Sequence, residues 1–418
     1  MTAAQARSVQ RRFLVLRALR WVPAGLTIPV MVLLMTERGF SLAEIGVIGA
    51  AQGAMVLVLE LPTGGLADAL GRRPVVLLAT VIDLIALALF VVAHTFWLLV
   101  AVRMLQGAYR ALDSGPLDAW YVDATLTADP DADIERGMSR GGAVIGVAIA
   151  GGALLAGGLV ALDPLPAVEP LAVPLLLAVV LRVVESVAVW LLMTEVRAPL
   201  GWSALRASVA TVPLVIRDAV AAVRASGVLL GLAAVELFWG FGMTTFETLL
   251  PPRLAEVTGS ADYAAALLGP ASSAAWLVSA AGAAAIPWVT RRLGSAATGA
   301  GLHVFQGLTV AAMGVAAGPV GVIAAYLVTY GIHGAANPVY VSLLHREVTA
   351  DHRTTVLSVT SMASQSSGAL GGIALGWMAD TAGLTPAMVA GAVMLALAAP
   401  CYLPAHRAER ARRVGLAA

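Results

Sequence analysis

Long apolar stretches alternate with short polar connections along the whole chain. A helix needs about 20 mostly apolar residues to cross a bilayer, and in lipid only helices and closed barrels satisfy all their backbone hydrogen bonds. The apolar runs have this length and fall at 13–36, 43–66, 74–95, 97–122, 138–161, 171–193, 227–250, 263–288, 296–317, 319–344, 355–377 and 385–404. The pattern therefore predicts an all-α membrane protein with twelve transmembrane helices.

Composition agrees with a membrane-embedded chain. Of the 418 residues, 59% are hydrophobic and 12% are charged, whereas soluble domains carry roughly 25% charged residues. The first apolar run is too long for the core of a signal peptide, so it is expected to remain as an uncleaved first helix. The single Cys401 excludes an internal disulfide, and the histidines show no metal-ligand spacing. We therefore expect no metal and no cofactor.

Arginines gather in alternate connections between the apolar runs. One side of the membrane receives Arg72, Arg73, Arg136, Arg140, Arg197, Arg206, Arg217, Arg224, Arg291, Arg292, Arg346, Arg353 and the tail from Arg407 to Arg413. The other side receives Arg38 and Arg253. By the positive-inside rule both termini are cytoplasmic. All 26 basic residues are arginine. Because lysine codons are rich in adenine, this suggests a GC-rich bacterial genome and hence the bacterial plasma (inner) membrane.

The longest connection divides the chain into two similar parts. Its stretch "ALRASVATVPLVIRDAVAAVRASG" spaces Arg206, Arg217 and Arg224 among apolar residues, which is typical of an amphipathic helix lying on a membrane surface. We expect an N-terminal six-helix bundle over 1–193, a cytoplasmic amphipathic linker over 194–226 and a C-terminal six-helix bundle over 227–418.

An internal repeat supports this division. Aligning Gly71 with Gly294 pairs "LADALGRRPVV" with "WVTRRLGSAAT", and the second copy lacks the acidic position. A second alignment pairs "RMLQGAYRALD" in the fourth run with "YGIHGAANPVY" in the tenth. Both alignments are offset by six apolar runs, so the two bundles are predicted to be pseudo-symmetric.

A glycine-rich connection after the second run carries a recognisable motif. Its pattern is Gly64-x-x-x-Asp68-x-x-Gly71-Arg72-Arg73, which resembles motif A of the major facilitator superfamily. The preceding "ELPTG" looks like the drug-efflux branches, and "RMLQG…AWYVD" in the fourth run looks like a second signature of the superfamily. The resemblance covers the whole chain and implies secondary transport by alternating access.

The chemistry of this motif suggests a conformational latch. Asp68 can face the positive N-terminal end of a helix in the other half, near Thr355. Arg72 would then bridge Asp68 and Asp123, the acid that ends "AWYVD". The alternative is that Arg72 and Arg73 only fix the topology.

One departure from the superfamily's pattern bears on the direction of transport. Efflux antiporters of the superfamily often carry a glycine-proline signature in the fifth span, but "GVAIAGGALLAGGLV" has glycines and no proline. Close helix packing explains these glycines as well as export does.

Polar residues within the fourth and tenth runs mark the candidate substrate site. Ionisable groups inside a membrane are costly, so they are functional candidates by default. At about 100° per residue the polar residues of each run share one face, and we expect the two faces to line one central cavity suited to an amphipathic, ring-containing substrate. The predicted lining is Arg103, Gln106, Arg110 and Asp113 with Tyr326, Tyr330, His333, Asn337 and Tyr340. Alternatively, Arg110 and Asp113 pair locally and His333 is a satisfied interior histidine.

Three carboxyl groups within the runs are candidates for proton coupling. Glu236 lies among aromatic residues with no basic residue within a helical turn, so it is expected to bind and release a proton near neutral pH. Asp83 shares this isolation, whereas Glu185 is expected to pair with Arg182 three residues before it. Glu247 is expected near the outer end of its helix, where it reaches water.

These features favour a secondary active transporter that exports small amphipathic, drug-like or antibiotic-like compounds by proton-coupled antiport. Its expected partners are a small-molecule substrate, protons and the lipid bilayer, with no nucleic acid, and a monomer is expected. The alternatives are a metabolite importer on the same scaffold and a transport-inactive membrane sensor. The sequence has no Ser/His/Asp grouping, no H-E-x-x-H and no GxxxxGK[ST] loop, so an enzyme is not expected.

Overall fold

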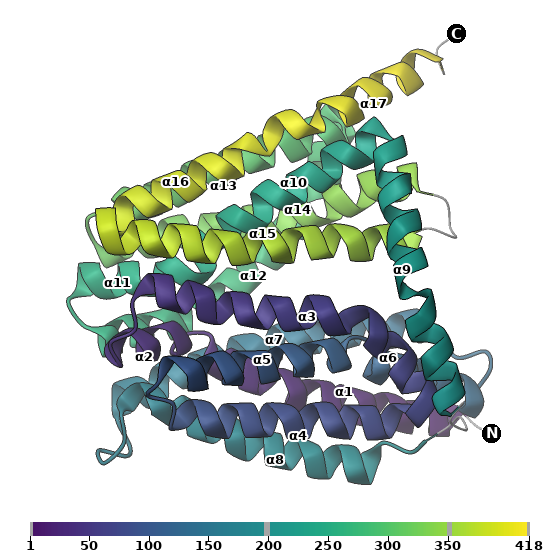
Figure 1. The fold of residues 1–418 in the computed structure, drawn as a ribbon, viewed down its shortest axis with the longest axis horizontal. Helices are drawn as coiled ribbons and strands as arrows, with labels where there is room; N and C mark the ends of the chain where they lie inside the picture. The colour runs from purple at the N-terminus through teal and green to yellow at the C-terminus, as the bar shows by residue number, and fades with distance from the viewer. Residues whose placement is uncertain (1–2, 196–200, 349–352, 416–418) are drawn as a thin grey trace. The chain divides into compact units, whose positions relative to one another are not determined.

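The computed structural model describes residues 3–195, 201–348 and 353–415 (Figure 1). These residues form helices and their connections, with no strand among them. The N-terminal elements are α1 (Ala3–Thr27), α2 (Met31–Glu37), α3 (Leu42–Leu70), α4 (Arg72–Val91), α5 (Phe96–Asp113), α6 (Pro116–Ala128), α7 (Ile134–Leu162), η1 (Pro170–Ala172) and α8 (Val173–Leu192). The later elements are α9 (Trp202–Ala225), α10 (Gly227–Thr244), η2 (Thr245–Leu249), α11 (Leu250–Thr258), α12 (Ala261–Leu293), α13 (Ser295–Val315), α14 (Pro319–Glu347), α15 (Arg353–Ala382), α16 (Leu384–Leu397), η4 (Ala399–Tyr402) and α17 (Leu403–Gly415).

The predicted all-α membrane fold is confirmed, and each of the twelve predicted runs overlaps a helix. Within the described ranges, nine helical segments are long and apolar enough to cross a membrane. The helices α5, α13 and α15 are not among these nine segments. The fourth run is not one helix, because α5 ends at Asp113 and α6 begins at Pro116. Gly115 has a φ of 102° there, a conformation that favours glycine, and proline suits the first turn of the next helix.

The chain forms two compact units. Unit 1 comprises Met1–Leu34, Ala51–Val212 and Ala265–Ser273, and unit 2 comprises Met35–Ala50, Pro213–Ala264 and Ala274–Ala418. The main boundary lies inside α9, the helix that occupies most of the predicted linker. Two short stretches cluster with helices distant in sequence, the start of α3 with unit 2 and the start of α12 with unit 1.

Glycines let these stretches approach their neighbours closely. In unit 2, a Cβ atom on Gly46 of α3 would lie 2.2 Å from the carbonyl oxygen of Gly372 on α15. In unit 1, a Cβ atom on Gly269 of α12 would lie 2.7 Å from the carbonyl oxygen of Ala153 on α7. Side chains larger than hydrogen are excluded at both contacts, as in other membrane helix pairs whose backbones touch.

The interior of unit 1 is built around α1, which packs against α7 and α8, while α4 packs against α5 and α8. An apolar cluster lies where α1 meets α6, with Phe13 stacked on Tyr121 at 4.3 Å between ring centroids. In unit 2, α10 packs against α15, and α13 packs against α14 and α16. These contacts fix the rotation of each helix and so decide which polar side chains face inward.

Candidate functional site

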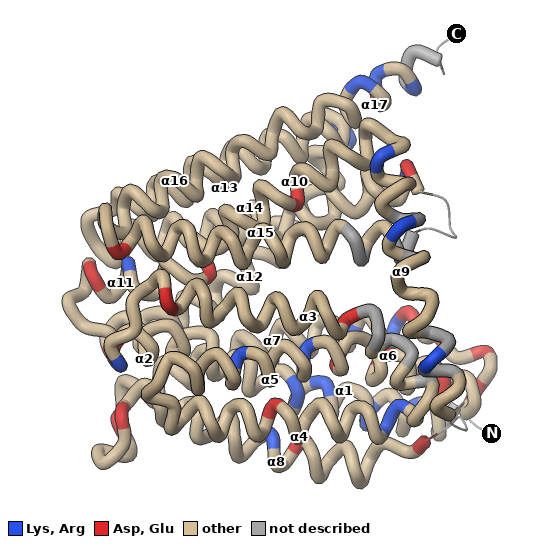
Figure 2. The backbone as a smooth tube through the Cα atoms, in the orientation of Figure 1, with Lys and Arg blue, Asp and Glu red and all other residues tan. Residues whose placement is uncertain are grey.

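Charged residues lie partway along several helices of unit 1. Figure 2 shows them on α1, α4, α5 and α8, away from the helix ends. What we call the charge cluster consists of four of these residues, Arg20, Asp83, Arg182 and Glu185, together with Asp113, the last residue of α5. Burial of such groups in an apolar interior is tolerated only with close partners, so the pairing of each one is informative.

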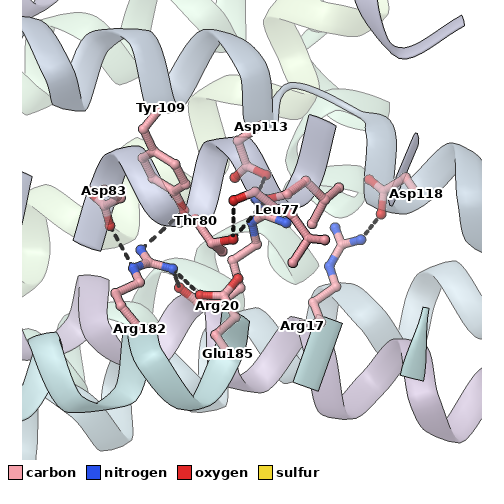
Figure 3. Close-up of polar contacts among 11 residues, drawn as sticks. Arg17, Arg20, Leu77, Thr80, Asp83, Tyr109, Asp113, Asp118, Arg182 and Glu185 are labelled. Atoms are coloured by element: carbon pink, nitrogen blue, oxygen red, sulfur yellow. Dashed lines mark hydrogen bonds and ion pairs between the residues drawn. The ribbon is translucent and has the colours of Figure 1, made fainter. Parts of the chain in front are cut away.

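Arg182 of α8 is the centre of the charge cluster (Figure 3). Its Nε lies 2.6 Å from Asp83 Oδ2 on α4, and its Nη1 donates to Glu185 Oε2 one turn further along α8. Nη2 donates to the Tyr109 hydroxyl at 3.1 Å, and Nη1 also lies 3.1 Å from the Arg20 carbonyl oxygen. The Arg182 guanidinium thus links four helices: α1, α4, α5 and α8.

Arg20 of α1 forms the other half of the charge cluster. It is ion-paired with Asp113 at the end of α5, and its guanidinium lies 5.8 Å from the centre of the Tyr109 ring. One turn before it, Arg17 pairs with Asp118 of α6. A recess of about 90 Å³ beside these two pairs is lined by Arg17, Arg20, Trp21, Asp113 and Asp118, among others. The charge cluster therefore borders an open recess at its Asp113 end.

These contacts correct part of the sequence interpretation. The expected Arg182–Glu185 pair is confirmed. The expected isolation of Asp83 is wrong, because its partner Arg182 comes from a helix about a hundred residues away. The local Arg110–Asp113 pair is also absent, since Asp113 binds Arg20 and Arg110 is exposed.

The remaining polar residues of α5 pair among themselves. Arg103 Nη1 donates to Gln106 Oε1 at 2.9 Å and lies 3.1 Å from the Met31 sulfur. Gln106 is buried. A cavity shared by these residues and α14 stays a prediction.

Unit 2 instead gathers aromatic side chains around Tyr330 and His333 of α14. We call this group the aromatic cluster: Trp239, Phe246, Trp276, Tyr326, Tyr330 and His333. Trp239 stacks on His333 with 5.6 Å between ring centroids and 12° between ring planes. Tyr330 contacts Tyr326 at 4.8 Å and Trp276 at 6.3 Å, both edge to face. Trp239, Trp276 and His333 are only partly buried, so part of the aromatic surface is accessible.

A carboxyl group adjoins the aromatic cluster. The Tyr330 hydroxyl donates to Glu247 Oε1 at 2.8 Å. Glu247 lies in the π-helical turn η2, a deviation that often marks functional sites. Glu247 is exposed at the protein surface, and its bond to Tyr330 was not predicted. Of the other predicted lining residues, Asn337 is exposed and Tyr340 is buried in the apolar core of unit 2.

Glu236 lies on α10, three residues before Trp239. Ser364 of α15 hydrogen-bonds to it, and a Cβ atom on Gly240 would lie 2.2 Å from the Ser364 carbonyl oxygen. This close approach of α10 and α15 brings the hydroxyl to the carboxyl group. No ion pair joins Glu236 to any other residue that the structure describes.

The predicted latch residues lie around the connection between α3 and α4. Gly71 has a φ of 96°, and Arg72 forms an ion pair with Asp123 of α6. Arg73 Nη2 donates to the Trp190 carbonyl oxygen at 2.6 Å. Gly64 and Asp68 lie on α3, but their side-chain environments, like that of Thr355, are outside the described residues.

Two carboxylates cap helices at the corner that carries the predicted motif and at the corner of unit 2 that aligns with it. Glu195, which follows α8, accepts the backbone N–H groups of Arg72 and Arg73 at 3.3 and 3.0 Å. At the aligned corner of unit 2, Glu409 of α17 accepts the Ala296 N–H at 3.2 Å, next to Gly294 with a φ of 87°. Both arrangements place negative charge at the positive end of a helix.

A third carboxylate caps α3. Asp380 of α15 accepts the Leu42 and Ala43 N–H groups at 3.0 and 2.8 Å, beside the Gly46–Gly372 contact. The sequence pattern did not single out Arg20, Glu195, Asp380 or Glu409. Arg20 could have been flagged as a charge inside the first apolar run, but the caps depend on contacts between distant helices.

The chain belongs to the Major Facilitator Superfamily, whose family model matches residues 13–372. Its structure is similar to that of the nucleoside transporter NupG, with a TM-score of 0.78, 14% identity, and coverage of 94% of this chain and 98% of that one. It is similar to a bacterial homologue of the human lysosomal transporter Spinster, inward-facing and unoccupied, with a TM-score of 0.76, 16% identity and coverage of 97% and 98%.

A third similar structure is the human organic anion transporter MFSD10 (TETRAN), with a TM-score of 0.61, 17% identity and coverage of 96% and 100%. No curated protein matches this chain in sequence. At these identities the structural likeness concerns the fold, and the family membership makes the chain a membrane transporter.

Proposed function

We propose that the protein is a proton-coupled antiporter that exports small amphipathic, ring-containing compounds across the bacterial inner membrane. The observation that carries this proposal is the aromatic cluster of unit 2, with its partly exposed Trp239 and His333 and the adjoining Glu247. Aromatic faces bind flat apolar rings, and they attract cations through the negative face of the ring. A neighbouring carboxylate strengthens the preference for cationic compounds.

In this proposal Glu236 couples substrate movement to protons. Its hydrogen-bond partner is the Ser364 hydroxyl, which can donate to a carboxylate or accept from a carboxylic acid. Glu236 therefore keeps a partner in both protonation states. A proton-coupled alternating-access cycle needs such a group, because the group takes up a proton on one side of the membrane and releases it on the other.

Purified protein in liposomes tests the export proposal. Ethidium is a suitable probe because it combines aromatic rings with a permanent positive charge and is therefore not trapped by protonation. Antiport predicts that an acidic vesicle interior drives ethidium accumulation as protons leave. Vesicles without protein provide the control. Absence of gradient-driven movement for a panel of lipophilic cations and antibiotics would contradict the proposal.

The direction of the effective gradient separates this proposal from metabolite uptake. The similar fold of NupG, named as a nucleoside transporter, makes nucleosides the natural comparison probes. A proton-coupled importer would accumulate its substrate when the exterior, not the interior, is acidic. Nucleoside accumulation with this sign and no ethidium transport would replace export by uptake.

Glu236→Gln tests the coupling role separately. The amide keeps the size and hydrogen-bonding capacity of the side chain but cannot release a proton. We expect gradient-driven accumulation to disappear, while exchange of ethidium across vesicles without a gradient persists. Glu256→Gln on α11 is the matched control, since Glu256 is about half exposed and pairs locally with Arg253. Undiminished accumulation in Glu236→Gln would remove Glu236 from the coupling mechanism.

A further inference from the structure

The charge cluster of unit 1 has unequal numbers of opposite charges. Arg20 and Arg182 supply two guanidinium groups, and Asp83, Asp113 and Glu185 supply three carboxyl groups (Figure 3). Four of these side chains are 1–6% exposed, and Asp113 is 18% exposed. With every group ionised, the cluster would carry one uncompensated negative charge in an apolar interior.

The surrounding helices do not supply the missing positive charge. Arg17 of α1 lies near Asp113 but pairs with Asp118. On α5, Arg103 bonds to Gln106, Arg110 is exposed, and Tyr109 donates no charge. Facing α8, residues 141–162 of α7 and residues 170–172 of η1 contain no ionisable side chain, and Asp83 is the only charged residue in 74–91 of α4. The imbalance is therefore local to the cluster.

One added proton neutralises the cluster. An isolated buried carboxylate carries a large free-energy penalty, and buried charges are stable when they are paired. Two guanidinium groups with two carboxylates and one carboxylic acid satisfy this condition. The proton binds to a carboxylate oxygen and no other bond changes.

Glu185 has the least complete set of hydrogen bonds among the three carboxyl groups of the cluster. Its Oε2 accepts from Arg182, while Oε1 is buried and has no hydrogen-bond partner among the described residues. The side chain is 1% exposed. Asp83 and Asp113 each pair with a guanidinium from another helix. An unpartnered buried oxygen costs less free energy on a neutral carboxyl than on a carboxylate.

We propose that the charge cluster is a proton-binding site whose three carboxyl groups together hold one exchangeable proton. In this proposal the proton exchanges through Asp113, which lines the recess beside Arg17 and Trp21. The site lies in unit 1 and is distinct from Glu236 in unit 2. It does not depend on export being the correct direction of transport.

Infrared spectroscopy of the full chain in lipid vesicles tests the site without a transport measurement. A neutral carboxyl group has a carbonyl-stretch band that carboxylates lack, and the band shifts in D2O if the proton exchanges. At neutral pH, subtraction of the Glu185→Gln spectrum from the wild-type spectrum should leave one such band. Glu256→Gln, which alters a half-exposed carboxyl group outside the cluster, should leave it unchanged.

Three further variants test the count. Asp83→Asn or Asp113→Asn leaves two carboxyl groups for two guanidinium groups, so the band should disappear. Glu185→Asp keeps three carboxyl groups in the cluster, so the band should persist. Persistence of the unchanged band in Glu185→Gln would overturn the proposal, as would its absence from the wild-type protein. Failure of ethidium transport with an intact band would overturn only the export proposal.

Discussion

The two compact units stabilise their buried carboxyl groups in different ways. In unit 1, Asp83 and Glu185 bond to the Arg182 guanidinium, which is 3% exposed. In unit 2, Glu236 bonds to the Ser364 hydroxyl and Glu247 to the Tyr330 hydroxyl. A guanidinium can only donate hydrogen bonds, so it favours the carboxylate, whereas a hydroxyl can serve either protonation state.

This difference assigns different tasks to the units. The hydroxyl partners of Glu236 and Glu247 can bond to either protonation state of a carboxyl group, and Glu247 adjoins the aromatic cluster. The charge cluster of unit 1 links α1, α4, α5 and α8, so its first effect is on the stability of the unit. Substitutions in the charge cluster of unit 1 should therefore change thermal stability, and substitutions in the aromatic cluster of unit 2 should change ethidium binding.

The largest effect is expected for Arg182→Met. The substitution removes the cation shared by Asp83 and Glu185 and leaves buried carboxyl groups without compensation. Loss of one partner in such a network costs about 3–5 kcal/mol. We expect a much lower yield of monodisperse protein and a lower Tm, measured in the same detergent as wild type. Glu185→Gln is the matched control and should stay close to wild type, because it leaves two charges of each sign. Equal stability of Arg182→Met and wild type would show that the cluster does not hold unit 1 together.

Substrate affinity should depend on unit 2. Trp239→Ala removes the ring stacked on His333 and should weaken ethidium binding by about 1–3 kcal/mol, or roughly 5- to 150-fold in Kd, with little change in Tm. Fluorescence titration in detergent measures this. Trp288→Ala is the control, because Trp288 of α12 is 56% exposed and contacts Arg292 outside the aromatic cluster. Equal loss of affinity in both variants would indicate nonspecific weakening.

A third prediction concerns the Arg72–Asp123 pair of unit 1. If it biases the conformational equilibrium, Arg72→Ala should lower the transport rate about tenfold, which corresponds to about 1.4 kcal/mol, and leave detergent binding of ethidium unchanged. Arg136→Ala provides a comparison, since Arg136 is exposed at the start of α7. A wild-type transport rate in Arg72→Ala would reduce this pair to a topological or structural role.

The sequence predicted the helices well because lipid imposes a length and polarity on each one. It missed the break at Gly115, since the apolar pattern continues through Leu117 and Trp120, although the Gly-Pro pair is a local turn signal. The pairing of Asp83 with Arg182 could not be predicted, because it depends on the rotation of α4 against α8. Spacing within one helix did predict the Arg182–Glu185 pair.

The smallest effects are expected at the aligned helix corners of the two units. Glu195 accepts two backbone N–H groups at the start of α4, and Glu409 accepts one at the start of α13. Glutamine keeps one acceptor oxygen but loses the charge that interacts with the helix dipole, an effect of about 0.3–1 kcal/mol for exposed groups.

We therefore expect Glu195→Gln to lower Tm by a small amount at low salt and by less at high salt, because Glu195 is exposed and screening weakens its interaction. Glu409 is 12% exposed and also lies 4.0 Å from Arg346, so the effect of Glu409→Gln should depend less on salt. Thermal unfolding of both variants at two salt concentrations measures the difference, and identical salt dependence would mean that burial does not distinguish the two corners.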